Sequence, residues 1–295
     1  MIVHEPVLRA ETLEQLAPDG RGLLVDCTVG TGGHTEALLE AGATRVLGLD
    51  RDADVLQMAG QRLAVWKERV ELVHADYRSF DELLDGRGID RVDGVLADLG
   101  HSTVQIETEG RGFSFRRDDP LDMRMDRTQG PTLAELLDGV TPDALADVIF
   151  EFGEERHSRR IARAIVEARD GAGLASTLEL ASIVRRAVRQ RGHARIDPAT
   201  RTFQALRIWV NGELDGLAEF LRSAAHRLQT GARLVVISFH SLEDRIAKYA
   251  LRELEEGDEP VIRILTRKPV RAGPDEVLRN PRARSAKLRA AERVA

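Results

Sequence analysis

The stretch from Leu23 to Asp50 constrains the fold more than any other part of the chain. An apolar run at 23–25 leads into a turn with three glycines, a short amphipathic segment and a second apolar run at 46–49 that ends in Asp50. This alternation predicts a strand, a helix and a second strand parallel to the first. Glycines in the turn allow positive φ angles and let the backbone approach a ligand closely. The stretch therefore predicts one half of a nucleotide-binding α/β sheet.

Two carboxylates in this stretch bear on the identity of the ligand. The dinucleotide fingerprint G-x-G-x-x-G needs a glycine three positions after the second one, but here Gly33 follows Gly32 directly and position 35 is a threonine. Asp26 would sit poorly beside a pyrophosphate and well beside the amino group of S-adenosylmethionine. Asp50 stands where a carboxylate holds a ribose diol. The turn alone fits any glycine-containing α/β connection, and the two carboxylates favour S-adenosylmethionine over NAD.

Acidic residues follow three successive predicted strands, as Asp50, Asp76 and Asp98. Ligands of open α/β sheets bind at the carboxyl ends of the strands, so these side chains are expected at one site. Asp98 is the residue predicted to lie nearest the chemistry. Tyr77 is predicted either to contact an adenine ring or to serve as a packing aromatic.

The alternation of strands and helices stops near residue 110. Residues 109–130 are too long and too polar for a core connection. Their Phe113 and Phe115, beside several arginines, suit stacking on unpaired bases, or alternatively fill a domain junction while Arg–Asp pairs hold the loop. Residues 132–221 have helical patterns, including one continuous helix predicted over 202–221.

The strand pattern resumes at residues 233–238. We therefore predict a discontinuous α/β domain, residues 1–110 and 208–295. Residues 111–207 are expected to form an inserted all-helical domain that recognises the substrate.

Charge and composition narrow the class of protein. The chain has 295 residues and a net charge of −6, so contacts with nucleic acid must rest on local basic patches. Arginines outnumber acidic residues twelve to six between Gly153 and Arg207, which suits phosphate contacts. Cys27 is the single cysteine, which fits a reducing compartment. No leader, no apolar run of about 20 residues and no Cys/His cluster with metal-ligand spacing is present, so we expect a cytoplasmic protein without membrane or metal contacts.

Several long blocks resemble the MraW/RsmH family of ribosomal RNA small-subunit methyltransferases over essentially the whole chain. The blocks are HEPVL (4–8), DCTVGTGGHT (26–35), LDRD (49–52), DLGHS (98–102), GFSFRRDDPLDMRMD (112–126), GEERHSRRIARAI (153–165), DPATRTFQALRIWVN (197–211), SFHSLEDRI (238–246), LTRKPV (265–270) and NPRARSAKLRAAER (280–293). The chain departs from the family pattern at His101, where DLGHST replaces DLGVSS, and at Asp197, which replaces a histidine.

The resemblance implies a class I S-adenosylmethionine-dependent methyltransferase, a Rossmann-like sheet with an inserted helical domain. It implies methylation of the exocyclic N4 of one cytidine in the decoding centre of 16S rRNA, in the small ribosomal subunit, by a monomer or homodimer. The implied cofactor contacts are Gly32, Gly33, His34, Asp50, Tyr77, Asp98 and Gln105, with Asp26 added from the turn itself.

Two roles are added as hypotheses. Asp98 is the candidate catalytic acceptor for the amine hydrogens, and Arg159, Arg160 and Arg201 are candidate RNA contacts. The alternatives are a DNA or small-molecule N-methyltransferase, which would not need the insertion, and a catalytically silent rRNA-binding assembly factor, which could lose the carboxylates.

Overall fold

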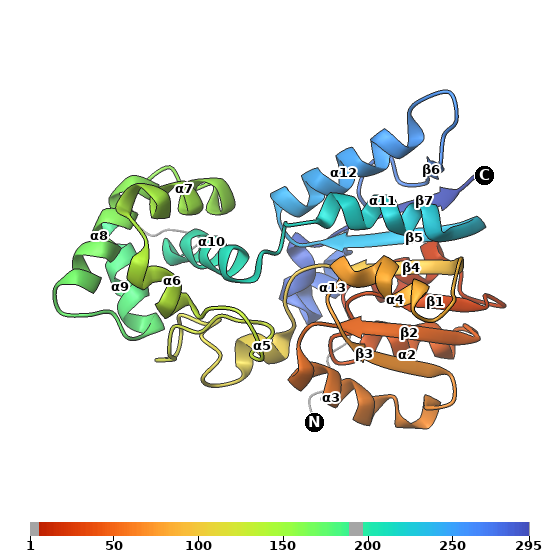
Figure 1. Ribbon diagram of the computed structural model, residues 1–295, viewed down its shortest axis with the longest axis horizontal. Helices are drawn as coiled ribbons and strands as arrows, with labels where there is room; N and C mark the ends of the chain where they lie inside the picture. The colour runs from red at the N-terminus through yellow and green to blue at the C-terminus, as the bar shows by residue number, and fades with distance from the viewer. Residues whose placement is uncertain (1–5, 189–196, 295) are drawn as a thin grey trace. The chain divides into compact units, whose positions relative to one another are not determined.

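The computed structural model describes residues 6–188 and 197–294. They divide into two compact units (Figure 1), which we call the sheet unit (Met1–Gly100 with Leu214–Ala295) and the helical unit (His101–Glu213). The boundaries expected from sequence, 111 and 207, fall inside the helical unit. Among the described residues, no helix has both the length and the apolar character needed to cross a membrane.

The described strands of the sheet unit form one seven-stranded sheet in the order β3-β2-β1-β4-β5-β7-β6. Neighbours among β1 to β5 are parallel, whereas β7 runs antiparallel to β5 and β6. The predicted Rossmann-like sheet is confirmed. The strands are β1 (Leu23–Asp26), β2 (Arg45–Asp50), β3 (Val70–His74), β4 (Val92–Asp98), β5 (Leu228–Ser238), β6 (Ile262–Ile264) and β7 (Lys287–Arg293).

Helices cover both faces of the sheet, so the unit has three layers (Figure 1). On one face, α4 (Phe80–Asp85), α11 (Leu217–Arg227) and α12 (Ser241–Glu255) bury apolar side chains against the strands. The other face is covered by α1 (Arg9–Leu16), α2 (Gly33–Glu40) and α3 (Ala53–Arg62). The remaining short elements are α13 (Pro274–Arg279), η1 (Ala64–Trp66), η2 (Tyr77–Ser79) and η3 (Pro281–Ser285).

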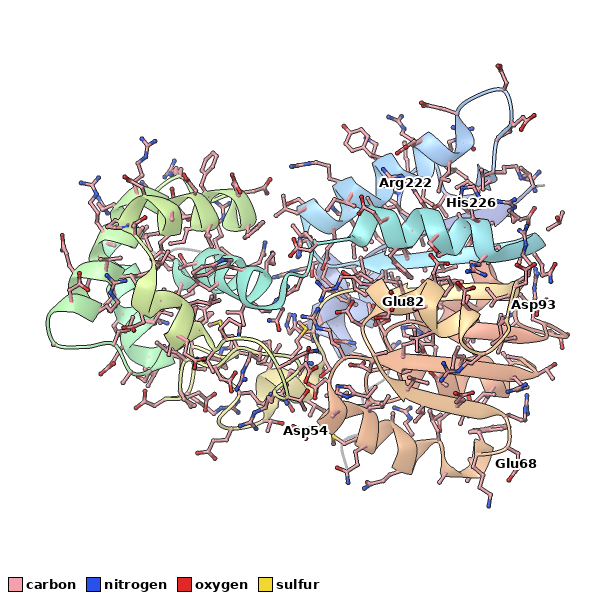
Figure 2. All side chains as sticks on the ribbon, in the orientation of Figure 1. Asp54, Glu68, Glu82, Asp93, Arg222 and His226 are labelled. Carbon is pink, nitrogen blue, oxygen red and sulfur yellow. The ribbon has the colours of Figure 1, made fainter. Side chains whose placement is uncertain are left out.

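The amphipathic character of these helices explains the layering. On α11, Phe220, Leu221 and Ala224 are buried, while His226 is exposed, and Figure 2 shows its side chain with that of Arg222. Because apolar residues recur at helical spacing, one stripe faces the sheet and the charged stripe faces solvent.

The helical unit has a separate apolar core, formed by residues such as Leu145, Ile161, Leu180 and Phe203. Thr132 begins one of its helices with a capping box that satisfies backbone donors at the helix start. The helices are α5 (Thr103–Glu107), α6 (Leu133–Gly139), α7 (Pro142–Gly153), α8 (Ser158–Asp170), α9 (Thr177–Val188) and α10 (Ala199–Asn211).

The continuous helix predicted over residues 202–221 is wrong. Helix α10 ends at Asn211, and Gly212 adopts φ +53° while its N–H donates to the carbonyls of Ile208 and Trp209. A left-handed glycine directly after the last helical residue is a common C-terminal cap. Gly216 is also left-handed, at φ +68°, and precedes α11. The apolar pattern runs through this turn because both helices bury a stripe, each in its own unit.

Candidate active site

Three carboxylates end neighbouring parallel strands at one edge of the sheet. Asp50 is the last residue of β2 and Asp98 is the last residue of β4. Asp26, at the end of β1 between them, lies opposite Gly48 of β2 and Leu96 of β4. Asp76 lies beyond the end of β3, and it pairs with Arg51 and Arg78 at 3.2 and 2.9 Å.

The glycine-rich turn after β1 has the conformation that its sequence requires. Gly30 and Gly32 adopt φ +55° and +86°, which disfavours any residue with a Cβ. On the neighbouring strand, a Cβ at Gly48 would lie 2.5 Å from Val29 Cγ2, so that position also needs glycine. The turn is therefore packed tightly against β2, where Asp50 ends the strand.

Asp50 is oriented by two backbone donors. Gly30 N–H donates to Oδ2 at 2.7 Å, and Asp52 N–H donates to Oδ1 at 2.9 Å. Burial raises the pKa of Asp50 to about 6, and the two hydrogen bonds oppose this rise. Each carboxylate oxygen keeps a second lone pair, so the group can accept two further hydrogen bonds from a diol.

Asp26 is completely buried and holds the turn together. Thr35 Oγ1–H donates to its Oδ2 at 2.7 Å, and Thr28 N–H donates to its Oδ1 at 3.2 Å. Burial raises the pKa of Asp26 to about 6. The structure thus gives Asp26 a role inside the protein, and its contact with a ligand amino group stays a prediction.

Asp98 and His34 present polar atoms that no described residue satisfies. His34 Nε2 lies 3.7 Å from Asp98 Oδ2, too far for a hydrogen bond. Both His34 Nε2 and Asp98 Oδ1 are buried, and neither has a hydrogen-bond partner among the described residues. Buried polar atoms nearly always have partners, so this pair is a candidate position for a bound polar group.

The protonation states of these two side chains follow from their surroundings. Burial and the negative charge of Asp26 raise the pKa of Asp98 to about 8, and Arg282 opposes the rise. Burial lowers the pKa of His34 to about 4. Near pH 7 the imidazole is therefore neutral, and the Asp98 carboxyl is largely protonated until a cation favours its ionised form.

Tyr77 lies in the apolar core of the sheet unit. Its ring centroid is 4.9 Å from that of Phe220 on α11, and the residue is 7% exposed. The structure therefore shows the packing role that the sequence left as one of two alternatives. A contact with adenine stays a prediction.

Phe239, the aromatic residue after β5, also lies at this edge of the sheet, a position that the sequence did not predict. Asp98 pairs with Ile237 in the sheet, which places Phe239 near Gly100. Gly100 has φ +101°, and a Cβ there would lie 3.3 Å from Phe239 Cδ2. Phe239 N–H donates to Glu243 Oε2 at 2.8 Å, which fixes the start of α12. The block SFHSLEDRI carried the only sequence signal for this position.

In the helical unit, Gln105 makes local contacts. So do His101 and Asp197, the two residues at which the chain departs from the family pattern. Gln105 Oε1 accepts from Ser102 N–H at 2.9 Å in a capping box that starts α5. His101 Nδ1 hydrogen-bonds to the guanidinium of Arg207. Asp197 pairs with Arg185 at 2.8 Å. A cofactor contact of Gln105 stays a prediction.

The three candidate RNA-binding arginines are exposed on the helical unit. Arg159 and Arg160 lie in the first turn of α8, and neither guanidinium is paired with a carboxylate among the described residues. Arg201, on α10, donates from Nη1 to the Glu154 carbonyl at 3.2 Å. Exposed, unpaired guanidinium groups suit contact with phosphates.

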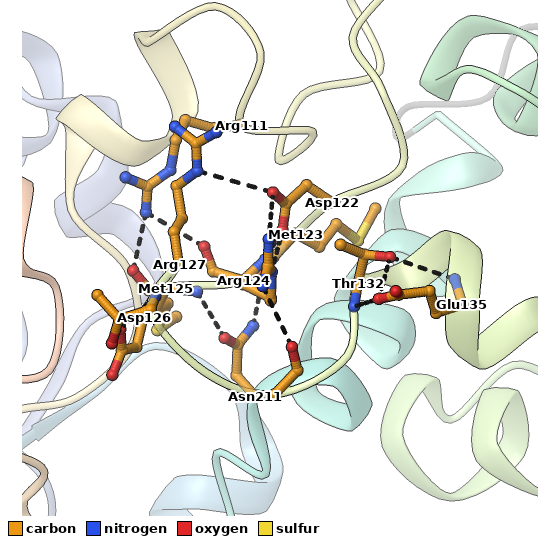
Figure 3. A network of polar contacts seen from close by, with 12 residues as sticks. Arg111, Asp122, Met123, Arg124, Met125, Asp126, Arg127, Thr132, Glu135 and Asn211 are labelled. Atoms are coloured by element: carbon orange, nitrogen blue, oxygen red, sulfur yellow. Dashed lines mark hydrogen bonds and ion pairs between the residues drawn. The ribbon is translucent and has the colours of Figure 1, made fainter.

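The long polar segment 109–130 is an ordered loop held by a polar network (Figure 3). Asn211 accepts from Met125 N–H at 2.7 Å and donates to the Met123 carbonyl at 2.8 Å. Arg111 Nη2 donates to the Met125 carbonyl at 3.0 Å, and Arg124 Nε lies 2.7 Å from Asp122 Oδ1. The structure therefore shows the Arg–Asp pairing that was one of the two alternatives.

The two phenylalanine rings of this loop contact other residues of the helical unit. The Phe115 ring centroid is 5.0 Å from that of Phe203. The Arg111 guanidinium lies 5.8 Å from the centroid of the Phe113 ring. Both rings thus have neighbours within the unit.

Comparisons with known proteins agree over nearly the whole chain. The profile of the MraW methylase family matches residues 1–294. "Ribosomal RNA small subunit methyltransferase H" of Sorangium cellulosum is 52% identical, over 99% of this chain and 91% of that protein. The protein of the same name from Kosmotoga olearia is 48% identical, over 99% and 97%. A solved rRNA methylase from Streptococcus thermophilus aligns over 100% of both chains with 13% identity and a TM-score of 0.44.

Proposed function

Because the chain belongs to the MraW methylase family, we propose that it methylates the exocyclic N4 of one cytidine in the decoding centre of 16S rRNA. The methyl donor is S-adenosylmethionine, and the fold is that of the class I methyltransferases that use it. The names of these relatives support the small ribosomal subunit as the substrate. The choice of cytosine N4 rests on the family resemblance.

The observation that carries the proposal is the pair of unsatisfied polar atoms, Asp98 Oδ1 and His34 Nε2, beside the glycine-rich turn. The residues present fit the donor: Asp50, oriented by two backbone donors, would hold the ribose diol, and the glycine-rich turn at Gly32 and Gly33 would lie against the ligand. S-adenosylmethionine supplies an electrophilic methyl group on a positively charged sulfur.

Asp98 would act on the acceptor amine. The N4 lone pair of cytosine is delocalised into the ring, so the amine is a weak nucleophile. An ionised Asp98 carboxylate accepting an N–H bond would favour a pyramidal nitrogen and orient it toward the methyl group, and this alignment would supply most of the acceleration. The ionised carboxylate can also take up the proton that the amine loses.

The RNA would be held through its phosphates. The target base has to leave its stack to reach a pocket in the protein. Arg159, Arg160 and Arg201 are exposed and would contact the flanking backbone. Reversing these three charges should weaken subunit binding and leave cofactor affinity intact. The control is Lys67→Glu, which reverses an exposed charge on the sheet unit, where the side chain is 78% exposed.

The direct test is methyl transfer from labelled S-adenosylmethionine to small ribosomal subunits that lack the modification, followed by nucleoside analysis. N4-methylcytidine is the expected product. Transfer to DNA or to free cytidine, with none to the subunit, would favour the DNA or small-molecule alternative. Subunit binding with no transfer to any acceptor would favour the silent assembly factor, and either result refutes the proposal.

A further inference from the structure

A positively charged pocket lies between α12 and the β6–β7 edge of the sheet unit. Of the seven described residues that line it, four carry a positive charge and none is acidic. The pocket has a volume of about 40 Å³, room for about three water-sized oxygen atoms at ~10–15 Å³ each. This volume can hold the two non-bridging oxygens of a backbone phosphate, but it is far too small for a base. The lining residues are Lys248, Leu251, Arg252, Ile264, Thr266, Arg267 and Arg289.

Two of the four cations are used in ion pairs within the protein. The side chain of Arg289 is 8% exposed, and its Nε lies 2.7 Å from Asp244 Oδ1. Arg267 Nη1 lies 3.0 Å from Glu255 Oε2. Lys248 and Arg252 have no carboxylate partner among the described residues. The pocket therefore keeps uncompensated positive charge, which attracts anions.

An exposed aromatic residue stands beside the pocket. Tyr249 is 57% exposed, and Lys248 Nζ lies 5.5 Å from the centroid of its ring. Arg245 and Arg252 lie four residues before and three residues after Tyr249, on the same exposed face of α12. Cations interleaved with an exposed ring are the combination by which proteins bind unpaired nucleotides, through phosphate contacts and base stacking.

We propose that Lys248, Arg252 and Tyr249 form a second RNA contact, on the sheet unit and separate from the arginines of the helical unit. Lys248 and Arg252 bind a backbone phosphate at the pocket, and Tyr249 stacks on an adjacent unpaired base. The inference rests on the proposed function, because it takes ribosomal RNA as the substrate. The loop after α12 carries Glu256, Asp258 and Glu259, so repulsion limits the contact to a few nucleotides.

The test is binding of unmodified small subunits as a function of salt concentration. In Lys248→Ala/Arg252→Ala, the slope of log Kobs against log salt should become shallower by about 0.7, because the variant loses the one single-strand phosphate contact that the two cations share. The KM for the subunit should rise roughly tenfold, with S-adenosylmethionine affinity and the rate at saturating RNA unchanged. Tyr249→Ala should weaken binding roughly tenfold without changing the slope, and Tyr249→Phe should restore it.

The matched control is Arg222→Ala/Arg263→Ala. It removes two cations of the same unit that pair with Glu253 and Glu292 and do not line the pocket. The second contact would be overturned if the pocket variants had the wild-type slope and KM. It would also be overturned if the control variant changed the slope and KM as much as the pocket variants do. Wild-type protein that binds subunits without methylating them would refute the proposed function, while its salt slope still tests the contact.

Discussion

The pKa of Asp98 predicts that binding of S-adenosylmethionine depends on pH in a way that binding of S-adenosylhomocysteine does not. Burial and Asp26 hold the pKa of Asp98 at about 8, so a bound cation has to favour the ionised carboxylate. The two ligands share the ribose, the adenine and the amino-acid group, and only the first carries a positive charge on sulfur. The ratio of their dissociation constants therefore isolates the interaction of Asp98 with the sulfonium.

The magnitude follows from linkage. Each pH unit below the pKa costs about 1.36 kcal/mol to ionise the carboxyl, a tenfold loss of affinity for a ligand that needs the charge. Between about pH 8 and pH 6 the upper limit is therefore ~100-fold. The Asp98 side chain is 24% exposed, and the screening that water provides lowers the expected change in the ratio to ~10-fold.

Isothermal titration calorimetry with both ligands at three or more pH values measures this ratio. Burial raises the pKa values of Asp26 and Asp50 to about 6, but in the proposed complex both carboxyls face groups that the two ligands share, so the effect of their titration on the ratio is expected to cancel. Asp98→Asn should flatten the ratio across the range. A ratio that does not change with pH in the wild-type protein, or that changes equally in Asp98→Asn, would refute the reasoning.

Three further predictions concern stability and are measured by thermal unfolding. Between about pH 4 and pH 8 the folded Asp98 carboxyl keeps a proton that the unfolded chain releases, so the stability of the fold falls as pH rises. Asp98→Asn should therefore unfold at a higher temperature than wild type near pH 8 and at the same temperature near pH 4. Gly112→Ala should destabilise by ~2 kcal/mol or more, because φ is +75° and the new Cβ would lie 2.5 Å from a carbonyl oxygen across the loop. Its control, Gly139→Ala, meets nothing within 4 Å and should be neutral or stabilising, so equal losses would contradict the steric argument. Asn211→Ala should cost ~2 kcal/mol by leaving backbone groups of the 109–130 loop without partners, and Asn211→Asp, which places a carboxylate oxygen against the Met123 carbonyl, should cost at least as much; an unchanged Asn211→Ala would refute the role of Asn211 in holding the loop.

The local sequence was sufficient to predict the strand–turn–helix unit around Gly32. Strand ends and glycine turns are set by residues close together in the chain, so Asp50 and Asp98 were expected at one edge before their neighbours were known. The family resemblance was equally readable, because it depends on contiguous blocks such as DCTVGTGGHT.

Helix boundaries were less predictable where two amphipathic helices follow one another. The apolar pattern of residues 202–221 is continuous, and periodicity alone cannot show that α10 and α11 bury their stripes in different cores. Gly212 and Gly216 were the available signals, since left-handed glycines end and precede helices.

The sequence by itself determined the fold class, the methyl-donor family and the residue types at the sheet edge. Only the tertiary structure decided how those residues are used: Tyr77 packs on Phe220, Asp26 accepts a hydrogen bond from Thr35, and Asp98 lies near His34 with its Oδ1 unpartnered among the described residues. The physical reason is that burial, hydrogen-bond satisfaction and pKa depend on groups far apart in the chain. The pocket beside α12 could not be predicted from the sequence either, because its cations come from segments that only the folded sheet brings together.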